Sequence, residues 1–290
     1  MRSCICKYNK RQIKYMKNKR IILIIIAICL SCNIKAQDII AKSSNNIGAA
    51  GILSIDVVDV LQSINPSIYS NAKGLNVSVS YTLPYHLTDL GQAQAKAVYS
   101  FPWATVHASV NKNGCSESSF TSFGGGLSRS FGFLGIGIEY NAIIHQMPFS
   151  ERCISSFSRF GFHAKPNDKW TLAVAVHNIE KRGFEYEYYD FDIESYLFAS
   201  AKWKGNSYFS LLCEVEKGWN HDANYKVATT IFPCKQLNTT IGFATLGHSL
   251  SAGIGYQNKL LMLHVGISYH EQLGVTSSAS VTIHNIFNIK

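Results

Sequence analysis

Histidine is the residue type in this sequence that is best suited to metal chemistry, because imidazole is a common metal ligand. Five histidines fall on the polar face of segments that alternate between apolar and polar residues: His107, His163, His177, His264 and His284. A metal site would need three or four of them within about 2.1 Å of one ion. Because they fall on strands spread around the wall of the sheet predicted below, most cannot converge. We therefore predict a polar lining, with no metal site and no cofactor.

The most distinctive group of aromatic and acidic residues lies in the segment 182–192. Six of its side chains are candidates for recognition: Phe184, Tyr186, Tyr188, Tyr189, Asp190 and Asp192. Two interpretations fit this composition. The segment is a docking site for a partner, a glycan or a divalent cation, or it is an interfacial loop. In the second case the aromatic rings lie among lipid head groups and the acids are solvated.

The sequence lacks a recognisable catalytic pattern. No constellation of serine, histidine and aspartate has local support, and paired carboxylates occur only in the segment 182–192. The run Gly124-Gly125-Gly126 is not followed by Gly-Lys-Ser/Thr, so it is not a phosphate-binding loop. We therefore predict no catalytic residues and no enzymatic activity. Together with Gly242, Gly253 and Gly255, these glycines instead leave room beside a sheet for a bulky element.

The elements that would position these side chains are β-strands. From Leu75 onward the chain repeats about ten residues of alternating apolar and polar side chains followed by a turn, the pattern of a closed antiparallel sheet. The predicted strands are 75–82, 93–101, 103–111, 119–129, 132–143, 156–164, 169–178, 194–203, 207–216, 222–232, 236–245, 248–256, 259–270 and 277–287. This pattern predicts an all-β fold, a transmembrane up-and-down antiparallel barrel of about fourteen strands over 75–290.

Parity along each strand assigns two faces to the predicted wall. In the first strand Val77, Val79 and Tyr81 point one way, and Ser78 and Ser80 point the other. The apolar face carries almost no charge in mid-strand, where a cation facing lipid would cost roughly 2–4 kcal/mol. Turns alternate between short and long, which places the long loops outside the cell and the termini in the periplasm. The predicted location is a Gram-negative outer membrane, with lipid and lipopolysaccharide as neighbours.

Residues 1–36 are predicted to be a secretory signal peptide. A basic stretch precedes the apolar run from Ile21 to Leu30, and cleavage is expected near Ala36. Residues 1–15 are then a long basic region or the product of a misassigned start codon. A lipoprotein anchored at Cys32 is the alternative, although Cys29 stands where a lipobox prefers leucine.

This leader also explains the basic balance of the whole chain. Nine of the 27 basic residues and none of the 18 acidic ones lie in it, so residues 37–290 carry 18 of each. No basic patch interleaved with aromatics is left, and we expect no binding of nucleic acid.

Four cysteines lie beyond the leader, at positions 115, 153, 213 and 234, and none has a CxxC spacing. This spacing argues against a zinc or dithiol centre. Cys115 and Cys153 fall in two long loops on the same predicted rim, in an oxidising compartment, so the sequence is compatible with a disulfide between them. Cys213 is expected on the apolar face of its strand.

Residues 37–74 precede the first strand and lack its alternation. Their apolar part, from Ile47 to Ile68, would be exposed to water unless it lay inside the barrel or across its periplasmic mouth. We therefore predict a plug. Asn65 before Pro66 should end a plug helix that begins around Val57, because proline pushes the preceding residue out of the helical region. We expect Asn65 to be buried against the wall and hydrogen-bonded there.

This N-terminal pattern resembles the plug of FadL-type outer-membrane barrels, which has glycines, an aspartate and an Asn-Pro-Ala tripeptide before the first strand. The matching residues are Gly48, Gly51, Asn65 and Pro66, with Ser67 in place of alanine. The PorV and PorQ barrels of the type IX secretion system share the pattern. The resemblance implies passage of small hydrophobic molecules across the outer membrane. Its alternative implication is a sealed barrel that docks components of type IX secretion.

Overall fold

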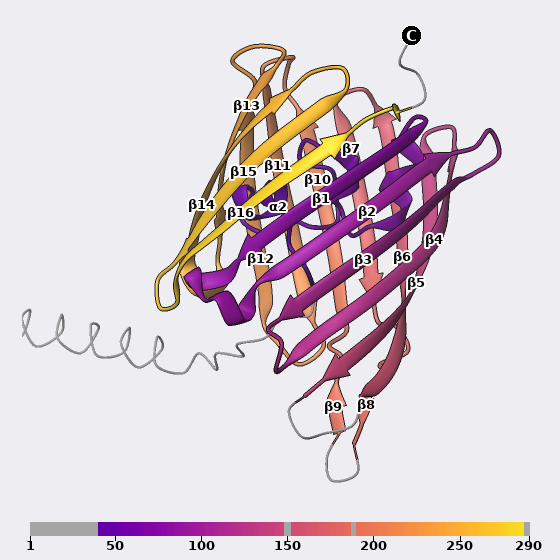
Figure 1. The fold of residues 1–290 in the computed structure, drawn as a ribbon. Coiled ribbons are helices and arrows are strands. Elements are labelled where there is room, and N and C mark those ends of the chain that lie inside the picture. The colour runs from indigo at the N-terminus through magenta and orange to yellow at the C-terminus, as the bar shows by residue number, and fades with distance from the viewer. Residues whose placement is uncertain (1–39, 148–151, 187–189, 287–290) are drawn as a thin grey trace, which may run out of the picture. The chain divides into compact units, whose positions relative to one another are not determined.

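The computed structural model describes residues 40–147, 152–186 and 190–286, which contain a closed antiparallel barrel (Figure 1). Within these residues the barrel has fourteen strands: β1 (Leu75–Leu83), β2 (Gln92–Ser100), β3 (Thr105–Gly114), β4 (Ser119–Phe131), β5 (Leu134–Gln146), β6 (Cys153–Asn167), β7 (Trp170–His177), β10 (Tyr196–Lys204), β11 (Phe209–Gly218), β12 (Ala223–Ile231), β13 (Leu237–Ala244), β14 (Ser249–Gln257), β15 (Leu261–His270) and β16 (Gly274–Ile283). Each overlaps a strand that the alternation predicts, and the predicted fold class is confirmed.

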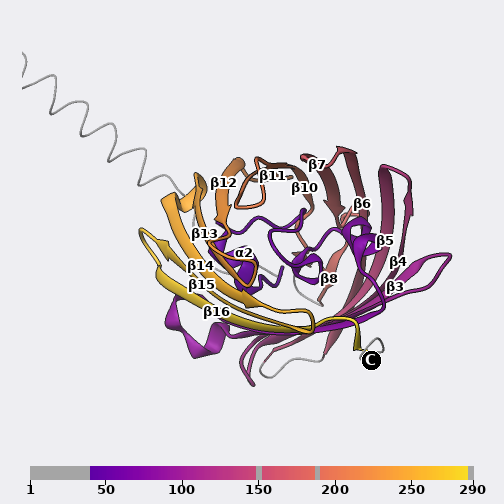
Figure 2. The same cartoon turned by 90° about the horizontal axis from the view of Figure 1, so that it is seen from above.

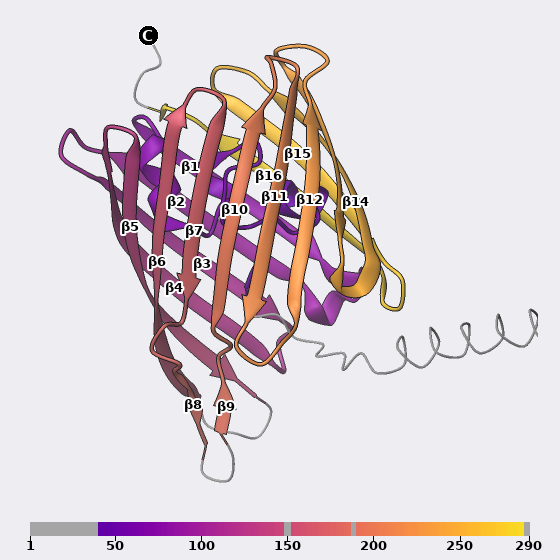
Figure 3. The same cartoon turned by 180° about the vertical axis from the view of Figure 1, so that it is seen from behind.

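Pairing between β1 and β16 closes the barrel, with Val79 opposite Val281. Neighbours in sequence pair around the rest of the ring except at β7, which pairs with β10. Between these two strands the chain forms a separate hairpin of β8 (Gly183–Glu185) and β9 (Asp190–Asp192). The sequence analysis missed this hairpin, which extends beyond the end of the barrel (Figure 3).

The two ends of the barrel differ in their connections. One end, the short-turn rim, has the connections 101–104, 132–133, 168–169, 205–208, 232–236 and 258–260. The other end, the long-loop rim, has the connections 84–91, 115–118, 147–152, 178–195, 219–222, 245–248 and 271–273. The chain beyond β16 leaves from the short-turn rim (Figure 1).

The wall has the two faces that parity predicts. On β1 the outward Val79 and Tyr81 are 56% and 52% exposed, whereas Ser78 and Ser80 are buried on the inner face. The backbone groups of the wall pair around a closed ring, so the ring has no unpaired strand edge. Among the described residues, no helix is both long enough and apolar enough to cross a membrane.

Residues 40–74, called the luminal segment below, run through the inside of the barrel (Figure 2). Their elements are the short helix α2 (Ser44–Gly48) and the 3₁₀ helices η1 (Val60–Gln62) and η2 (Pro66–Asn71). Most of the segment is buried. Its apolar side chains pack on inward-facing apolar residues of β7, β11 and β12, in a cluster formed by Ala49, Ile52, Ile55, Val57, Ile68, Ala173, Leu212 and Ala228.

The luminal segment passes from one rim to the other. Near its start, the carbonyl of Lys42 accepts a hydrogen bond from Thr82 at the long-loop end of β1 (2.6 Å). Near its end, the carbonyl of Ala72 accepts one from Ser100 at the short-turn end of β2 (2.7 Å). The segment therefore spans the length of the lumen rather than lying across one mouth.

The prediction of a plug helix that begins around Val57 and ends at Asn65 is wrong. Only the single turn η1 forms between Val57 and Asn65, and the side chain of Asp59 caps it. Much of this stretch is β-branched, which disfavours a helix, and Ile64 N donates to the Leu53 carbonyl (2.9 Å), which closes a loop instead. Asn65 stands at the start of η2, so it begins a helix rather than ending one.

The predicted signal peptide, including Cys32 and Ala36, lies outside the described residues, as do the candidate recognition residues Tyr188 and Tyr189.

Candidate functional site

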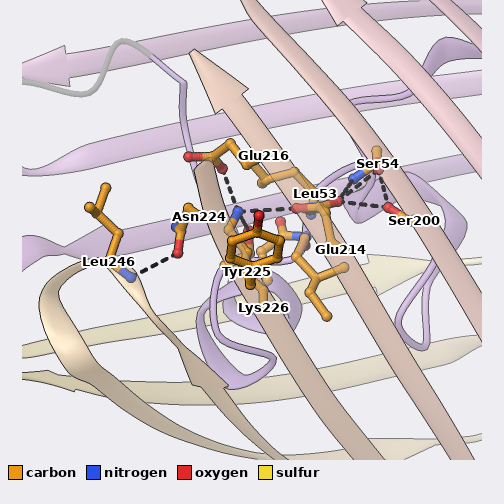
Figure 4. Close-up of polar contacts among 12 residues, drawn as sticks. Leu53, Ser54, Ser200, Glu214, Glu216, Asn224, Tyr225, Lys226 and Leu246 are labelled. Atoms are coloured by element: carbon orange, nitrogen blue, oxygen red, sulfur yellow. Dashed lines mark hydrogen bonds and ion pairs between the residues drawn. The ribbon is translucent and has the colours of Figure 1, made fainter. Parts of the chain in front are cut away.

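The contact between the luminal segment and β11 centres on a buried carboxylate. Glu214 accepts hydrogen bonds from the backbone N–H groups of Leu53 (3.1 Å) and Ser54 (2.8 Å). Lys226 on β12 pairs with the same carboxylate (3.0 Å) and donates to the carbonyl of Gly51 (2.6 Å). We call Glu214 and Lys226 the clasp (Figure 4). The negative Glu214 binds backbone N–H groups of the segment, and the positive Lys226 binds a backbone carbonyl.

The clasp is enclosed by further polar partners. Ser54 and Ser200 both donate to Glu214 through their hydroxyl groups, and Lys226 also pairs with Glu216. The side chains of Glu214 and Lys226 are 0% and 2% exposed. Hydrogen bonds to ionised groups are stronger than neutral ones, and a buried charge that loses its partner is costly. The clasp therefore fixes the position of residues 51–54 along the lumen.

Asn65 joins the luminal segment to β6 and β7. Its amide nitrogen donates to the Ser54 carbonyl (3.0 Å) and to the carbonyls of Phe162 and Val174 (both 3.3 Å). Its side-chain oxygen accepts from Ser67 N (3.0 Å), which caps η2. Asn65 is fully buried, as we expect from its place before Pro66.

Wall glycines allow the luminal segment to approach the strands closely. A Cβ on Gly137 would lie 2.5 Å from the backbone of Pro66, and one on Gly242 would lie 2.8 Å from Ala50 N. Gly253 of the wall faces Gly48 of α2, where an added Cβ on Gly48 would come within 2.9 Å of the Gly253 Cα. These distances are too short for any side chain, so the segment fits closely against the wall at these points.

The glycines that the sequence analysis groups together have different roles. Gly242 and Gly253 contact the luminal segment, whereas Gly255 lies under side chains of the wall itself. Gly125 points outward, where an added Cβ would meet no atom within 4 Å. Gly51 adopts a left-handed conformation (φ +74°), at the turn that presents its carbonyl to the clasp.

A second polar network lies on β2, β3, β5 and β6. Lys96 donates to Tyr69 Oη (2.6 Å) and to the Ser63 carbonyl (2.8 Å), both in the luminal segment. The Tyr69 hydroxyl in turn donates to the Ser63 carbonyl (2.6 Å). Next to it, Glu139 pairs with Arg159 (2.8 Å) and with His107 (3.1 Å). The segment is thus held by buried charges on two sides of the lumen.

The long-loop rim carries an aromatic cluster that we call the cap. Phe184 of the hairpin is 1% exposed and packs with inward residues at the rim ends of the strands. The buried members are Phe120, Ile143, Phe157, Phe184 and Ile193. Tyr186 is hydrogen-bonded to His145 at its edge. Of the other candidates, Asp190 and Asp192 are exposed.

The segment 182–192 is therefore divided between two environments. Its aromatic residues Phe184 and Tyr186 turn toward the barrel, and its acids Asp190 and Asp192 face solvent. Sequence analysis cannot detect this division, because β8 and β9 have three residues each, too few to show an alternation of apolar and polar side chains.

The predicted inward histidines do not converge. His163 contacts Ser67 Oγ (3.1 Å), His284 contacts Asn76 Oδ1 (3.2 Å), and His107 and His177 belong to the network around Glu139. Within the ranges that the structure describes, no three histidine, cysteine, aspartate or glutamate side chains are grouped as metal ligands. Cys115 and Cys153 are free thiols, and Cys213 is exposed on the outer face.

The fold is similar to those of two toluene transporters and a FadL homologue. The toluene transporter TbuX of Ralstonia pickettii has 10% sequence identity and a TM-score of 0.60, over 84% of this chain and 97% of its own. The toluene transporter TodX of Pseudomonas putida has 9% identity and a TM-score of 0.59, over 86% and 98%. A FadL homologue of Pseudomonas aeruginosa has 11% identity and a TM-score of 0.55, over 85% and 99%. At these identities the likeness concerns the fold.

No family model matches the sequence, and no curated protein matches it.

Proposed function

We propose that this chain is an outer-membrane barrel of FadL type that passes small hydrophobic molecules. In this proposal the long loops face the outside, the termini lie in the periplasm, and residues 40–74 act as a plug. The signal peptide of residues 1–36 directs the chain to that membrane. The similar fold of proteins described as toluene transporters supports this class of cargo.

The observation that carries the proposal is the cap. Its buried residues Phe120, Phe157 and Phe184 lie where the long-loop rim meets the lumen, and their side chains would offer an apolar contact surface once the hairpin moves aside. A small aromatic hydrocarbon entering from this side would exchange one aromatic contact for another, with little desolvation cost. Passage then requires the luminal segment to shift, because it contacts the wall closely through Gly137 and Gly242.

A reversible lock of the luminal segment tests the proposal. The hydroxyl oxygens of Ser54 and Ser200 are in direct contact, so Ser54→Cys and Ser200→Cys would place two thiols close enough to form a disulfide. The double variant is made in a background without the cysteines at 115, 153, 213 and 234. We expect wild-type protein to admit toluene to proteoliposomes, the oxidised double variant to admit much less, and reductant to restore entry.

The matched control is the single variant Ser200→Cys, which should conduct in both redox states. No entry through the wild-type barrel would contradict passage. Equal entry through the locked and reduced forms would contradict the role of the plug.

A second candidate function is a sealed barrel that docks components of type IX secretion. The close fit of the luminal segment against wall glycines favours it, because such a lumen is closed at rest. In that case neither wild-type nor reduced protein would pass toluene. Removing the exposed acids Asp190 and Asp192 would then abolish binding of secretion components from the same bacterium.

A further inference from the structure

Charged residues are distributed unequally between the two rims of the barrel. The short-turn rim carries seven exposed basic residues, which we call the basic ring: Lys73, Arg129, Lys165, Lys169, Lys204, Lys235 and Lys259. Asp168 is the acidic residue among the described connections of this rim. On the long-loop rim, acidic residues such as Asp89, Glu117 and Asp192 outnumber the basic ones.

The charges of the basic ring are not neutralised by acidic side chains of the part of the chain that the structure describes. None of the seven takes part in an ion pair with another described residue. Lys165 donates to the neutral side chain of Asn71 (2.9 Å), and the guanidinium of Arg129 lies 5.2 Å from the ring centroid of Phe131. The ring is therefore free to attract anions from outside the molecule.

Exposed aromatic residues fix the depth of the basic ring relative to a bilayer. Trp103, Phe133 and Tyr208 are 57%, 59% and 63% exposed on the short turns, and Trp170 and Trp203 lie near them at strand ends. Aromatic side chains of this kind gather at the boundary between hydrocarbon and head groups. Basic residues at the same rim, such as Lys169 beside Trp170 and Lys204 beside Trp203, consequently lie at the level of the lipid head groups.

We propose that the basic ring binds the head groups of anionic phospholipids in the leaflet on the short-turn side. The basic ring extends around the circumference: Lys169, Lys235 and Lys259 lie on short turns, and Arg129, Lys165 and Lys204 lie at strand ends beside short turns. A protein partner would contact one arc of the rim, whereas lipid surrounds all of it. Each cation near an anionic surface contributes attraction that falls with salt. The proposal does not depend on what passes through the lumen.

Competition between lipids in bilayer nanodiscs tests the proposal. Wild-type protein is reconstituted in phosphatidylcholine with phosphatidylglycerol as the minor component, and the lipids retained on the barrel are counted by native mass spectrometry. We expect retained phosphatidylglycerol to be enriched several-fold over its bulk fraction, and this enrichment to fall in high salt. The variant Lys204→Gln, Lys235→Gln, Lys259→Gln should lose most of it.

The control variant carries Lys112→Gln, Arg152→Gln and Lys217→Gln on the long-loop rim, and it should keep the enrichment. Heat-modifiable migration on a gel checks that both triple variants are folded barrels. No enrichment in wild type, or enrichment that survives the first triple variant, would overturn the proposal. Enrichment lost only in the control would also overturn it.

Discussion

The luminal segment and the cap both obstruct the path through the barrel, but different forces hold them. Glu214 binds the segment through backbone N–H groups of Leu53 and Ser54, whereas Phe184 enters the cap by packing against aromatic side chains. A buried charge is costly to leave unpaired, while apolar packing has no preferred direction and tolerates sliding. We therefore expect the cap to open by itself, whereas the luminal segment should move only when several polar contacts break together.

The largest effect is expected from Glu214→Gln. Glutamine keeps the shape of the side chain but removes the charge that pairs with Lys226 and accepts from Leu53 and Ser54. Breaking one side of a buried ion pair costs about 3–5 kcal/mol. We expect the luminal segment to be released more often. A single cysteine at position 53 should then react faster with a bulky water-soluble maleimide than it does in the parent background.

The matched control for this variant is Glu194→Gln. Glu194 pairs with His221 (2.8 Å) at the long-loop rim, and both side chains are partly exposed. Such pairs contribute about 0–1 kcal/mol, so labelling at position 53 should not change. Equal labelling rates in the parent and in Glu214→Gln would show that the clasp does not hold the segment.

The next effect in size is expected at wall glycines that face the luminal segment. In Gly137→Val the added carbons would meet the backbone of Pro66, where a Cβ alone comes within 2.5 Å. Overpacking of this kind costs about 1–3 kcal/mol. The midpoint of guanidinium unfolding, followed by tryptophan fluorescence, should fall. Gly125→Val on the outward face is the control, and an equal loss there would attribute the effect to strand propensity instead.

Sequence analysis could predict the wall but not the clasp, for a physical reason. A strand alternates with period two, so the side chains of Val79 and Ser78 indicate their faces locally. The same alternation predicts all fourteen barrel strands of the described chain. Glu214 and Lys226 are ordinary inward charges on that pattern. Their partners are backbone groups about 160–175 residues away in the sequence, and no local rule links them.

Asn65 was predictable for the opposite reason. Its role follows from its neighbour Pro66 and from its own side chain, which can cap a helix and satisfy a bend. The local rule could not tell whether Asn65 ends a preceding helix or begins a following one. In the structure it caps the N-terminus of η2, the helix that follows it. The hairpin of β8 and β9 was missed since each strand has three residues.

A smaller effect is expected from Asn65→Leu. Leucine fits the apolar surroundings but leaves the carbonyls of Ser54, Phe162 and Val174 without this donor. Leaving buried backbone groups unpaired costs about 1–3 kcal/mol. The unfolding midpoint should fall and labelling at position 53 should rise. Ser67→Ala, which keeps the Asn65 amide contacts, should remain close to wild type. Wild-type behaviour of the leucine variant would leave the resemblance to a FadL plug without a structural role.

The smallest effect on the whole barrel is expected from Phe184→Ala, and this variant separates the two regions most directly. Truncating a buried phenylalanine usually costs about 3–5 kcal/mol. Here the hairpin lies outside the ladder that closes the barrel, so the loss should lower the free energy of opening the hairpin alone. Limited proteolysis should cleave the segment 182–192 faster. The free energy of unfolding of the barrel should stay within about 0.5 kcal/mol of wild type. Asp192→Ala, an exposed change in the same hairpin, should leave both measurements unchanged. If Phe184→Ala instead lowered barrel stability as much as Glu214→Gln does, the cap and the luminal segment would unfold as one unit.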